Sequence, residues 1–369
     1  MEKFCLKTLI ANDIESELEK IGFDTAYRAK GADKFRYKTL KIFGLTVPQA
    51  NILKQTALSF GADCGVHREV LTNNINKTDV ILGGSYSQIK KICEKLKQQP
   101  FSLKFLSENI LEELEPQKRE TKLVGILNIT PDSFSDGGKY FKPQDAIKHL
   151  YQLIEDGADI IDIGAESTKH GADDIPAEEQ INRLRPILTS INDLPVPLSI
   201  DTRSAKVAQF ALENGISIIN DVSGLTYDSK LSEVVVQYNA SIVLQHSTNK
   251  TSEIPLYNDI VEDVYLDLHK KAQIAKSKGI KNIILDIGIG FGKNREHNLE
   301  LLKRFEEFHS LNYPLMVGIS RKSFLGVKDD NELKDSLTLA LSYPLINTGI
   351  DYLRVHNVKL HKQLLNSVI

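Results

Sequence analysis

The sequence predicts an α/β protein in which a small α+β domain precedes a (β/α)8 TIM barrel. From residue 121 onward, short apolar runs alternate with amphipathic stretches of helical spacing, a pattern typical of a parallel sheet. This part holds eight such units in roughly 250 residues, which is the usual size of a (β/α)8 barrel. A doubly wound open sheet is the competing architecture for the same pattern.

Residues 1–115 are expected to form the small domain, with a linker at 116–121 and the barrel at 122–369. Pro116 lies in a charged run and marks the boundary, because proline interrupts any helix that reaches it. Spacing predicts strands at FCLKTLI (4–10) and FRYKTLKIF (35–43), and helices at IESELEKIGF (14–23), PQANILKQTALSFGA (48–62) and QIKKICEKLK (88–97).

The run DVILGGS (79–85) is expected to pass from a strand into a helix that Ser85 or Ser87 caps. A strand, two glycines and a helix N-terminus can bind an anion, but an ordinary capped turn explains the same residues. The role of the first domain stays open.

The barrel strands are predicted from eight apolar runs: KLVGILN (122–128), ADIIDIG (158–164), PLSID (197–201), SIIND (217–221), SIVLQH (241–246), NIILDIG (282–288), PLMVGIS (314–320) and DYLRVH (351–356). The clearest helices between them are PQDAIKHLYQLIEDGA (143–158), EEQINRLRPILTSIN (178–192), SAKVAQFALENG (204–215) and NDIVEDVYLDLHKKAQIAKSKG (258–279).

The composition excludes several classes of partner. There are 46 basic and 49 acidic residues, so the net charge of −3 gives no reason to expect nucleic acid or a membrane surface. The three cysteines form no metal-binding or disulfide pattern, which suits a reducing cytosol. The charged N-terminus does not read as a signal peptide, and no apolar run has the length of a membrane span. We therefore expect a cytoplasmic protein.

Every predicted barrel strand ends in polar or ionisable residues. In a barrel these ends meet at one face, where active sites are built. They are Asn128, Asp162, Asp201, Asn220 with Asp221, His246, Asp286, Ser320 with Arg321 and Lys322, and Arg354 with His356. Carboxylates and amides suit a nitrogen-rich heterocycle, the cations suit an anion, and hard oxygens suit Mg2+. The set predicts a planar heteroaromatic substrate that carries a phosphate or diphosphate.

Seven motifs then identify a family. NITPDSFSDGG, DIIDIGAEST, SIDT, IIND, LDIGIGFGK, GISRKS and LRVH occur in this order between about residues 122 and 358. Together they resemble dihydropteroate synthase, a folate-pathway enzyme built on a (β/α)8 barrel. The resemblance implies that the chain joins 6-hydroxymethyl-7,8-dihydropterin diphosphate to p-aminobenzoate and releases diphosphate. It also implies Mg2+ as cofactor and a homodimer formed through the last barrel helices.

The resemblance carries roles over to individual residues. It implies that Asp286 pairs with the pterin amino-pyrimidinone edge and that Asn220 and Asp201 bind other ring atoms. Lys322 would reach the pterin carbonyl, and Arg354 would lie along the pterin and face the diphosphate. The remaining matches are Asn128 and His356 near diphosphate and Mg2+, with Asn128 as the metal ligand, Ser323 at the p-aminobenzoate carboxylate, Phe291 lining the pocket, and Thr168 with Lys169 as substrate contacts in the second loop.

The loop after the first strand would close over the bound substrates. The resemblance implies that Phe134 covers the aminobenzoate ring, that Asp136 orders the closed state, and that Asp132 contacts Mg2+. The reaction would begin with loss of diphosphate and leave a pterin-stabilised cation, which carboxylates such as Asp201 favour. A closed loop would keep water from that cation.

Several residues depart from the family pattern. Lys169 and His170 stand where Arg and Pro are usual, Ile287 replaces Pro, and Asn357 replaces Asp. Gln245 and Ser247 flank His246 in place of two methionines, and His246 itself is expected to be a hydrogen-bonded strand-end residue. A methyltetrahydrofolate methyltransferase-like enzyme and a non-catalytic pterin-binding protein remain the alternatives. The first would not need the cations, and the second would not need the closing loop.

Overall fold

The computed structural model describes residues 5–9, 14–72, 74–115, 119–129, 143–166, 174–191, 193–248 and 254–368. The chain divides into two compact units, Met1–Gln117 and Lys118–Ile369, and each has its own hydrophobic core. The second unit is a closed eight-stranded barrel and the first contains a small sheet, so the predicted fold class is confirmed. In the described part of the chain, no helix combines the length and apolar character needed to cross a bilayer.

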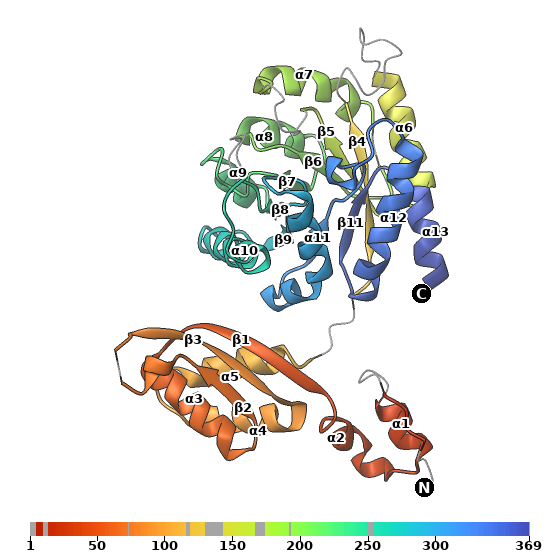
Figure 1. The fold of residues 1–369 in the computed structure, drawn as a ribbon. Coiled ribbons are helices and arrows are strands. Elements are labelled where there is room, and N and C mark those ends of the chain that lie inside the picture. The colour runs from red at the N-terminus through yellow and green to blue at the C-terminus, as the bar shows by residue number, and fades with distance from the viewer. Residues whose placement is uncertain are drawn as a thin grey trace. The chain divides into compact units, whose positions relative to one another are not determined.

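The first unit is built on a three-stranded antiparallel sheet in the order β1-β3-β2 (Figure 1). Its elements are α1 (Ile14–Lys20), α2 (Arg28–Ala32), β1 (Tyr37–Thr46), α3 (Val47–Ser59), β2 (Asp63–Val66), β3 (Lys77–Ser85), α4 (Tyr86–Leu96) and α5 (Leu103–Glu112), with 3-10 turns at Thr25–Tyr27 and Arg68–Val70. Along β3, Val80 and Leu82 are buried, whereas Ile81 between them is 53% exposed. One face of the sheet is therefore covered and the other is open.

The strand predicted at residues 4–10 is wrong. Its described residues, 5–9, belong to no helix or strand, and Leu6 is 91% exposed. Alternating apolar and polar residues form a stable strand only where neighbouring strands supply hydrogen-bond partners and a covered face. The short strand β2 and the helix α5 were not predicted.

The DVILGGS run ends in a capped helix. Ser85 Oγ accepts a hydrogen bond from the Gln88 backbone N–H at 3.3 Å, and Gln88 Oε1 accepts one from the Ser85 N–H at 2.8 Å. This reciprocal capping box satisfies the first donors of α4, so the glycines and serine need no bound anion to explain them.

Eight parallel strands close the second unit in the order β10-β11-β4-β5-β6-β7-β8-β9, so neighbours in sequence are neighbours around the ring. They are β4 (Lys122–Asn128), β5 (Ile160–Gly164), β6 (Leu198–Asp201), β7 (Ile218–Asp221), β8 (Ser241–Gln245), β9 (Asn282–Asp286), β10 (Leu315–Val317) and β11 (Tyr352–Val355). Each predicted run contains one of them, and the open-sheet alternative is excluded.

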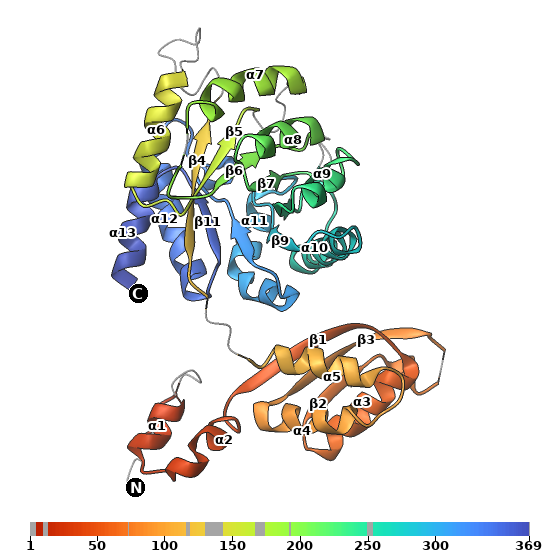
Figure 2. The ribbon, with the colours of Figure 1, turned by 180° about the vertical axis from the view of Figure 1, so that it is seen from behind.

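Helices surround the strands on the outside, as Figures 1 and 2 show from opposite sides. They are α6 (Pro143–Glu155), α7 (Ala177–Leu188), α8 (Ala205–Glu213), α9 (Leu231–Gln237), α10 (Ile260–Ser277), α11 (Arg295–Lys303), α12 (Asn331–Asn347) and α13 (Val358–Val368), with 3-10 turns at Phe305–Leu311 and Ser323–Leu325. The large core cluster lies between these helices and the outward side chains of the strands.

The barrel interior changes from apolar to polar along the strands. Successive side chains of a strand alternate between its two faces, so residues two apart point the same way. The early inward positions form a separate apolar cluster: Val124, Ile160, Ile218, Val243, Ile284 and Met316, with Tyr352 packed against it. The inward positions two residues further along these strands hold polar side chains: Asp162, Asn220, Asp286 and Arg354. The strands therefore carry a polar layer on an apolar floor.

A chain that begins at Lys118 is expected to fold without the first unit, because every described residue of the barrel core lies at or after Leu123. This chain keeps Arg119, which bonds Asp351, and Thr121, whose hydroxyl donates to the Ile350 carbonyl at 2.8 Å. Circular dichroism and cooperative thermal unfolding would test the expectation. A chain that begins at Lys122 loses both contacts and should unfold at a lower temperature. An unfolded 118–369 chain would contradict the prediction.

Candidate active site

The polar layer centres on Arg354, which joins two buried carboxylates. Its Nε donates to Asp162 Oδ2 at 2.6 Å and its Nη2 donates to Asp201 Oδ2 at 3.0 Å. Asp162 and Asp201 come from the neighbouring strands β5 and β6 and are 1% and 6% exposed. Asn220, on the next strand, donates from Nδ2 to the same Asp162 oxygen at 2.9 Å. Two strands thus present carboxylates to one guanidinium, and a third strand adds an amide that bonds one of those carboxylates.

Four buried polar atoms around this centre have no hydrogen-bond partner among the residues that the structure describes: Asp162 Oδ1, Asp201 Oδ1, Asn220 Oδ1 and Gln245 Nε2. Leaving a buried polar group without a partner costs roughly 1–3 kcal/mol. Three acceptors and one donor of this kind in one barrel mouth are therefore a sign of a bound polar molecule. A planar ring with several N–H donors and a carbonyl would satisfy them.

Asp286 and Lys322 form the opposite side of the mouth. Asp286 Oδ1 accepts a hydrogen bond from the Gly288 N–H at 2.7 Å, and burial raises the pKa of this carboxyl despite the positive charge of Lys322. Burial lowers the pKa of Lys322 to about 8, although Asp286 favours its charged form. The Lys322 ammonium bonds the Ile289 carbonyl and lies 4.7 Å from the centre of the Phe291 ring.

Lys293 is a buried lysine that was not predicted as part of the site. Its Nζ lies 2.8 Å from His246 Nδ1 and donates to the Gly288 and Phe291 carbonyls at 2.8 and 3.1 Å. Burial lowers the pKa of Lys293 to about 7 and that of His246 to about 2, so His246 is neutral. This lysine ties the loop after β9 to the end of β8. His246 is the hydrogen-bonded strand-end residue that was predicted.

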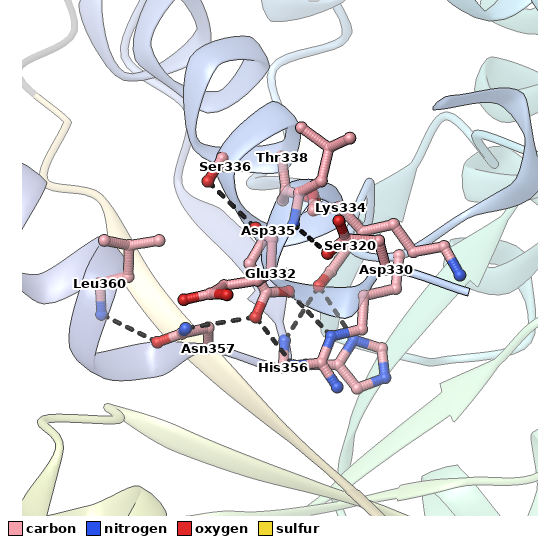
Figure 3. A network of polar contacts seen from close by, with 12 residues as sticks. Ser320, Asp330, Glu332, Lys334, Asp335, Ser336, Thr338, His356, Asn357 and Leu360 are labelled. Atoms are coloured by element: carbon pink, nitrogen blue, oxygen red, sulfur yellow. Dashed lines mark hydrogen bonds and ion pairs between the residues drawn. The ribbon is translucent and has the colours of Figure 1, made fainter. Parts of the chain in front are cut away.

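The turn after β10 is attached to α12 and to the end of β11 (Figure 3). Arg321 was predicted to supply positive charge for an anion. It binds Asp335 with two hydrogen bonds of 2.8 Å, so a carboxylate balances its charge. Ser320 Oγ accepts from the His356 N–H at 3.1 Å and lies 2.9 Å from His356 Nδ1. Ser323 begins the following 3-10 turn and is exposed.

Two other strand ends differ in their surroundings. Asp221 turns away from the mouth: it is fully buried and accepts hydrogen bonds from the Ser223 and Leu225 N–H groups at 2.8 and 2.6 Å, so it stabilises the loop after β7. Asn128 is the last residue of β4 and lies beside Gly164. A Cβ atom added to Gly164 would lie 3.3 Å from Asn128 Oδ1. In the described part of the chain, no three His, Cys, Asp or Glu side chains could hold a metal ion.

Some predicted contacts lie outside the described residues. These are Asp132, Phe134 and Asp136 in the first loop and Thr168, Lys169 and His170 in the second. The described residues on either side of the second loop share one cation. Arg203 donates from Nη2 to Glu166 at 3.2 Å and to Asp174 at 2.7 Å, while its guanidinium lies 4.0 Å from the centre of the Tyr227 ring.

Replacing Asp201 with Asn is expected to flatten the pH dependence of the unfolding free energy. Burial raises the pKa of this carboxyl to about 7, above its ordinary value of 3.8. A raised pKa contributes stability below about pH 4 that is lost as the pH rises through about 7. Urea unfolding from pH 4 to 8 should show a shallower decline in the variant.

Ser199→Ala is the matched control for Asp201→Asn, because it changes a buried neighbour on β6 and removes no titratable group. Its curve should run parallel to that of the wild type. Parallel curves for Asp201→Asn and the wild type would contradict the prediction and mean that Asp201 stays ionised throughout.

Comparison with known families matches residues 124–356 to the pterin binding enzymes. The chain belongs to the pterin-binding enzyme family. The matched residues run from β4 to the end of β11 and contain the whole polar layer. The resemblance predicted from the seven motifs is confirmed.

Curated members of the family extend the comparison. A dihydropteroate synthase from Clostridium beijerinckii is 42% identical over 244 residues, which cover 64% of this chain and 89% of that protein. A Helicobacter pylori protein named bifunctional dihydropteroate synthase/dihydropteroate reductase is 33% identical over 371 residues, which cover 98% of this chain and 97% of that protein. The chain spans only 40% of the length of two further relatives, from Haloferax volcanii and Halobacterium salinarum.

A solved family structure shares the barrel. The dihydropteroate synthase of Xanthomonas albilineans, solved with 4-aminobenzoic acid, has a TM-score of 0.63 and 33% identity. The match covers 67% of this chain and 92% of that one. The matched length is about that of the second unit, Lys118–Ile369.

Proposed function

We propose that the chain is a dihydropteroate synthase that joins 6-hydroxymethyl-7,8-dihydropterin diphosphate to p-aminobenzoate. The observation that carries the proposal is the set of buried polar atoms without partners beside Arg354 and Lys322. An amino-pyrimidinone ring offers the N–H donors and the carbonyl that these atoms need. The names of the family members at 33–42% identity support the same activity.

The arrangement supports a reaction in which diphosphate leaves first. The bond between the methylene carbon and the diphosphate oxygen breaks, and its electron pair leaves on oxygen. Arg354 would place a fixed positive charge near the leaving diphosphate. Asp201 and Asp286 would stabilise the positive charge on the pterin. The aniline nitrogen of p-aminobenzoate then forms the new C–N bond and loses a proton.

Several other residues have a place in this scheme. Asn220 and Gln245 would hydrogen-bond the pterin edge, and Phe291 would line the ring beside Lys322. Ser323 would receive the carboxylate of p-aminobenzoate, since this exposed residue begins a short helical turn. His356 would lie near the diphosphate.

Asn128 fits a magnesium ion bound mainly through substrate. Mg2+ usually keeps several waters and takes one or two protein oxygens plus substrate phosphates, so a three-residue cage is not needed. The side-chain oxygen of Asn128 at the end of β4 is a suitable donor for that mode, and Asp132 would be a second. When bound, Mg2+ would neutralise charge on the leaving diphosphate.

The test is to mix the chain with pterin diphosphate, p-aminobenzoate and Mg2+ and to measure dihydropteroate and diphosphate by chromatography. Stoichiometric formation of both products supports the proposal. Binding of pterin diphosphate without product would favour a non-catalytic pterin-binding protein. Transfer of a methyl group from methyltetrahydrofolate, with no condensation, would favour the methyltransferase alternative.

A second candidate function is the reduction of dihydropteroate. The Helicobacter pylori relative, whose name includes dihydropteroate reductase, matches 98% of this chain and therefore both units. The full chain and the 118–369 chain would each be given dihydropteroate with NADPH or reduced methyl viologen as electron donor. Consumption of dihydropteroate by the full chain alone would support a reductase that needs the first unit. No consumption with either donor would count against it.

We also propose a cytoplasmic homodimer. Leu333 and Tyr343 on α12 are each 46% exposed, which leaves apolar surface on the helices that the resemblance assigns to the dimer. Light scattering after gel filtration measures the mass directly, and a mass of one chain would contradict the dimer.

A further inference from the structure

The turn between β10 and Lys322 has an unusual backbone. The Lys322 N–H donates to the Ile319 carbonyl at 3.3 Å, which closes a four-residue turn. Arg321 occupies the third position with φ of +58°. Side chains with a Cβ rarely adopt this left-handed conformation, and glycine is the residue that takes it readily. An arginine there needs contacts from outside the turn to hold it.

Asp335 supplies those contacts. Its Oδ1 accepts from Arg321 Nε and its Oδ2 from Arg321 Nη2, both at 2.8 Å, which is the paired geometry that a planar guanidinium favours. Asp335 lies on α12 and is only 5% exposed. Burial opposes its charge, but Arg321 outweighs this effect and the pKa of Asp335 is lowered. The carboxylate that holds the turn is therefore ionised.

Asn357 completes the support from the next strand end. Its Nδ2 donates to Asp335 Oδ2 at 3.2 Å, and its Oδ1 accepts from the Leu360 N–H at 3.1 Å at the start of α13. Figure 3 shows Asp335, Asn357, His356 and Ser320 gathered between α12 and the end of β11. An amide can donate to Asp335, whereas an aspartate at position 357 would face it with a second carboxylate.

The supported turn leads directly into Lys322. The lysine follows Arg321 in the chain, and its ammonium reaches the Ile289 carbonyl and the Phe291 ring. A rotation of the backbone at Arg321 would carry the Lys322 side chain away from these groups. A misplacement of about 1 Å can cost a reaction about a hundredfold in rate.

We infer that Asp335 is a positioning residue, which holds Arg321 in the left-handed conformation and so directs Lys322 into the pterin pocket. The inference rests on the proposed function, because Lys322 is assigned to pterin binding there. Asp335 acts through Arg321.

The test compares Asp335→Asn with the double variant Arg321→Gly/Asp335→Asn in the full chain. Asn cannot accept both guanidinium bonds, so kcat/KM for pterin diphosphate should fall about tenfold. Glycine adopts a positive φ without contacts from Asp335. The kcat/KM of the double variant should therefore recover to within about threefold of the wild-type value. The thermal unfolding temperature is measured for every variant.

The rescue separates positioning from a structural role. If Asp335 only stabilises the fold, removing Arg321 as well deletes one more side chain and cannot restore turnover. A double variant that stays as slow as the single one while remaining folded would overturn the inference, as would an unchanged Asp335→Asn. An inactive wild type would instead refute the proposed function.

Asn357→Asp provides a second test if Asp335→Asn does not fold. This variant keeps Asp335 and Arg321 but places a carboxylate beside Asp335, so kcat/KM should fall about threefold at pH 8. Adding Arg321→Gly should reduce that loss. Unchanged kinetics of folded Asn357→Asp, with Asp335→Asn unfolded, would overturn the inference.

Discussion

Replacing Arg354 with methionine is expected to lower the unfolding free energy by about 3–5 kcal/mol, because two buried carboxylates lose their common partner. Asp162 and Asp201 are 1% and 6% exposed, so removing the guanidinium leaves two buried carboxylates without their cation. Condensation should fall below detection, because the proposed mechanism assigns Arg354 to the leaving diphosphate. Urea unfolding at pH 8 and product chromatography measure the two effects.

Arg304→Met is a matched control for the loss of stability. Arg304 also pairs with carboxylates, but its side chain is 30% exposed, and those of Asp259, Glu300 and Glu307 are 42%, 39% and 51% exposed. Exposed pairs contribute about 0–1 kcal/mol each, so this variant should lose much less stability. Equal losses for the two variants would show that burial of the Arg354 centre is not what makes it important.

Replacing Lys322 with alanine is expected to reduce turnover at least about tenfold, which corresponds to roughly 1.4 kcal/mol of transition-state stabilisation. The variant removes the cation that bonds the Ile289 carbonyl and lies beside Phe291, and it removes the positive charge that opposes the raised pKa of Asp286. Steady-state kinetics with pterin diphosphate varied would measure the loss.

Two controls define the meaning of that result. Lys303→Ala removes a lysine whose side chain is 77% exposed on α11, and it should leave the kinetics unchanged. Lys322→Met keeps most of the volume and loses only the charge, so it should resemble Lys322→Ala. Unchanged kinetics in Lys322→Ala would remove this lysine from the proposed mechanism.

The barrel and most of its polar layer could be predicted because strand periodicity fixes both. Each strand run was long enough to identify, and parallel strands in a ring can only bring their carboxyl ends together. Asp201, Asn220, Asp286 and Arg354 follow from that geometry alone. Asp162 was predicted as a strand end but was given no role; a carboxylate inside the apolar run ADIIDIG is tolerated only in an inward position beside a polar partner.

Other features depended on contacts between residues far apart in sequence. Lys293 reads as the end of a tight glycine turn, and only the folded loop shows that it reaches back to His246. Arg321 reads as a substrate cation, because nothing in the sequence links it to Asp335. The predicted strand at 4–10 failed for the same reason, since alternation says nothing about whether a neighbouring strand is present.

Among the described residues, the apolar floor closes the barrel interior below the polar layer. The cavity between the floor residues and Asp162 has a volume of only about 10 Å3, which no ring system can traverse. Under the proposed function, pterin diphosphate and dihydropteroate would pass through the same end of the barrel, so a bound product would block the next substrate. The rate of product release, and competition between the product and the next substrate, would thus set an upper limit on the rate of turnover.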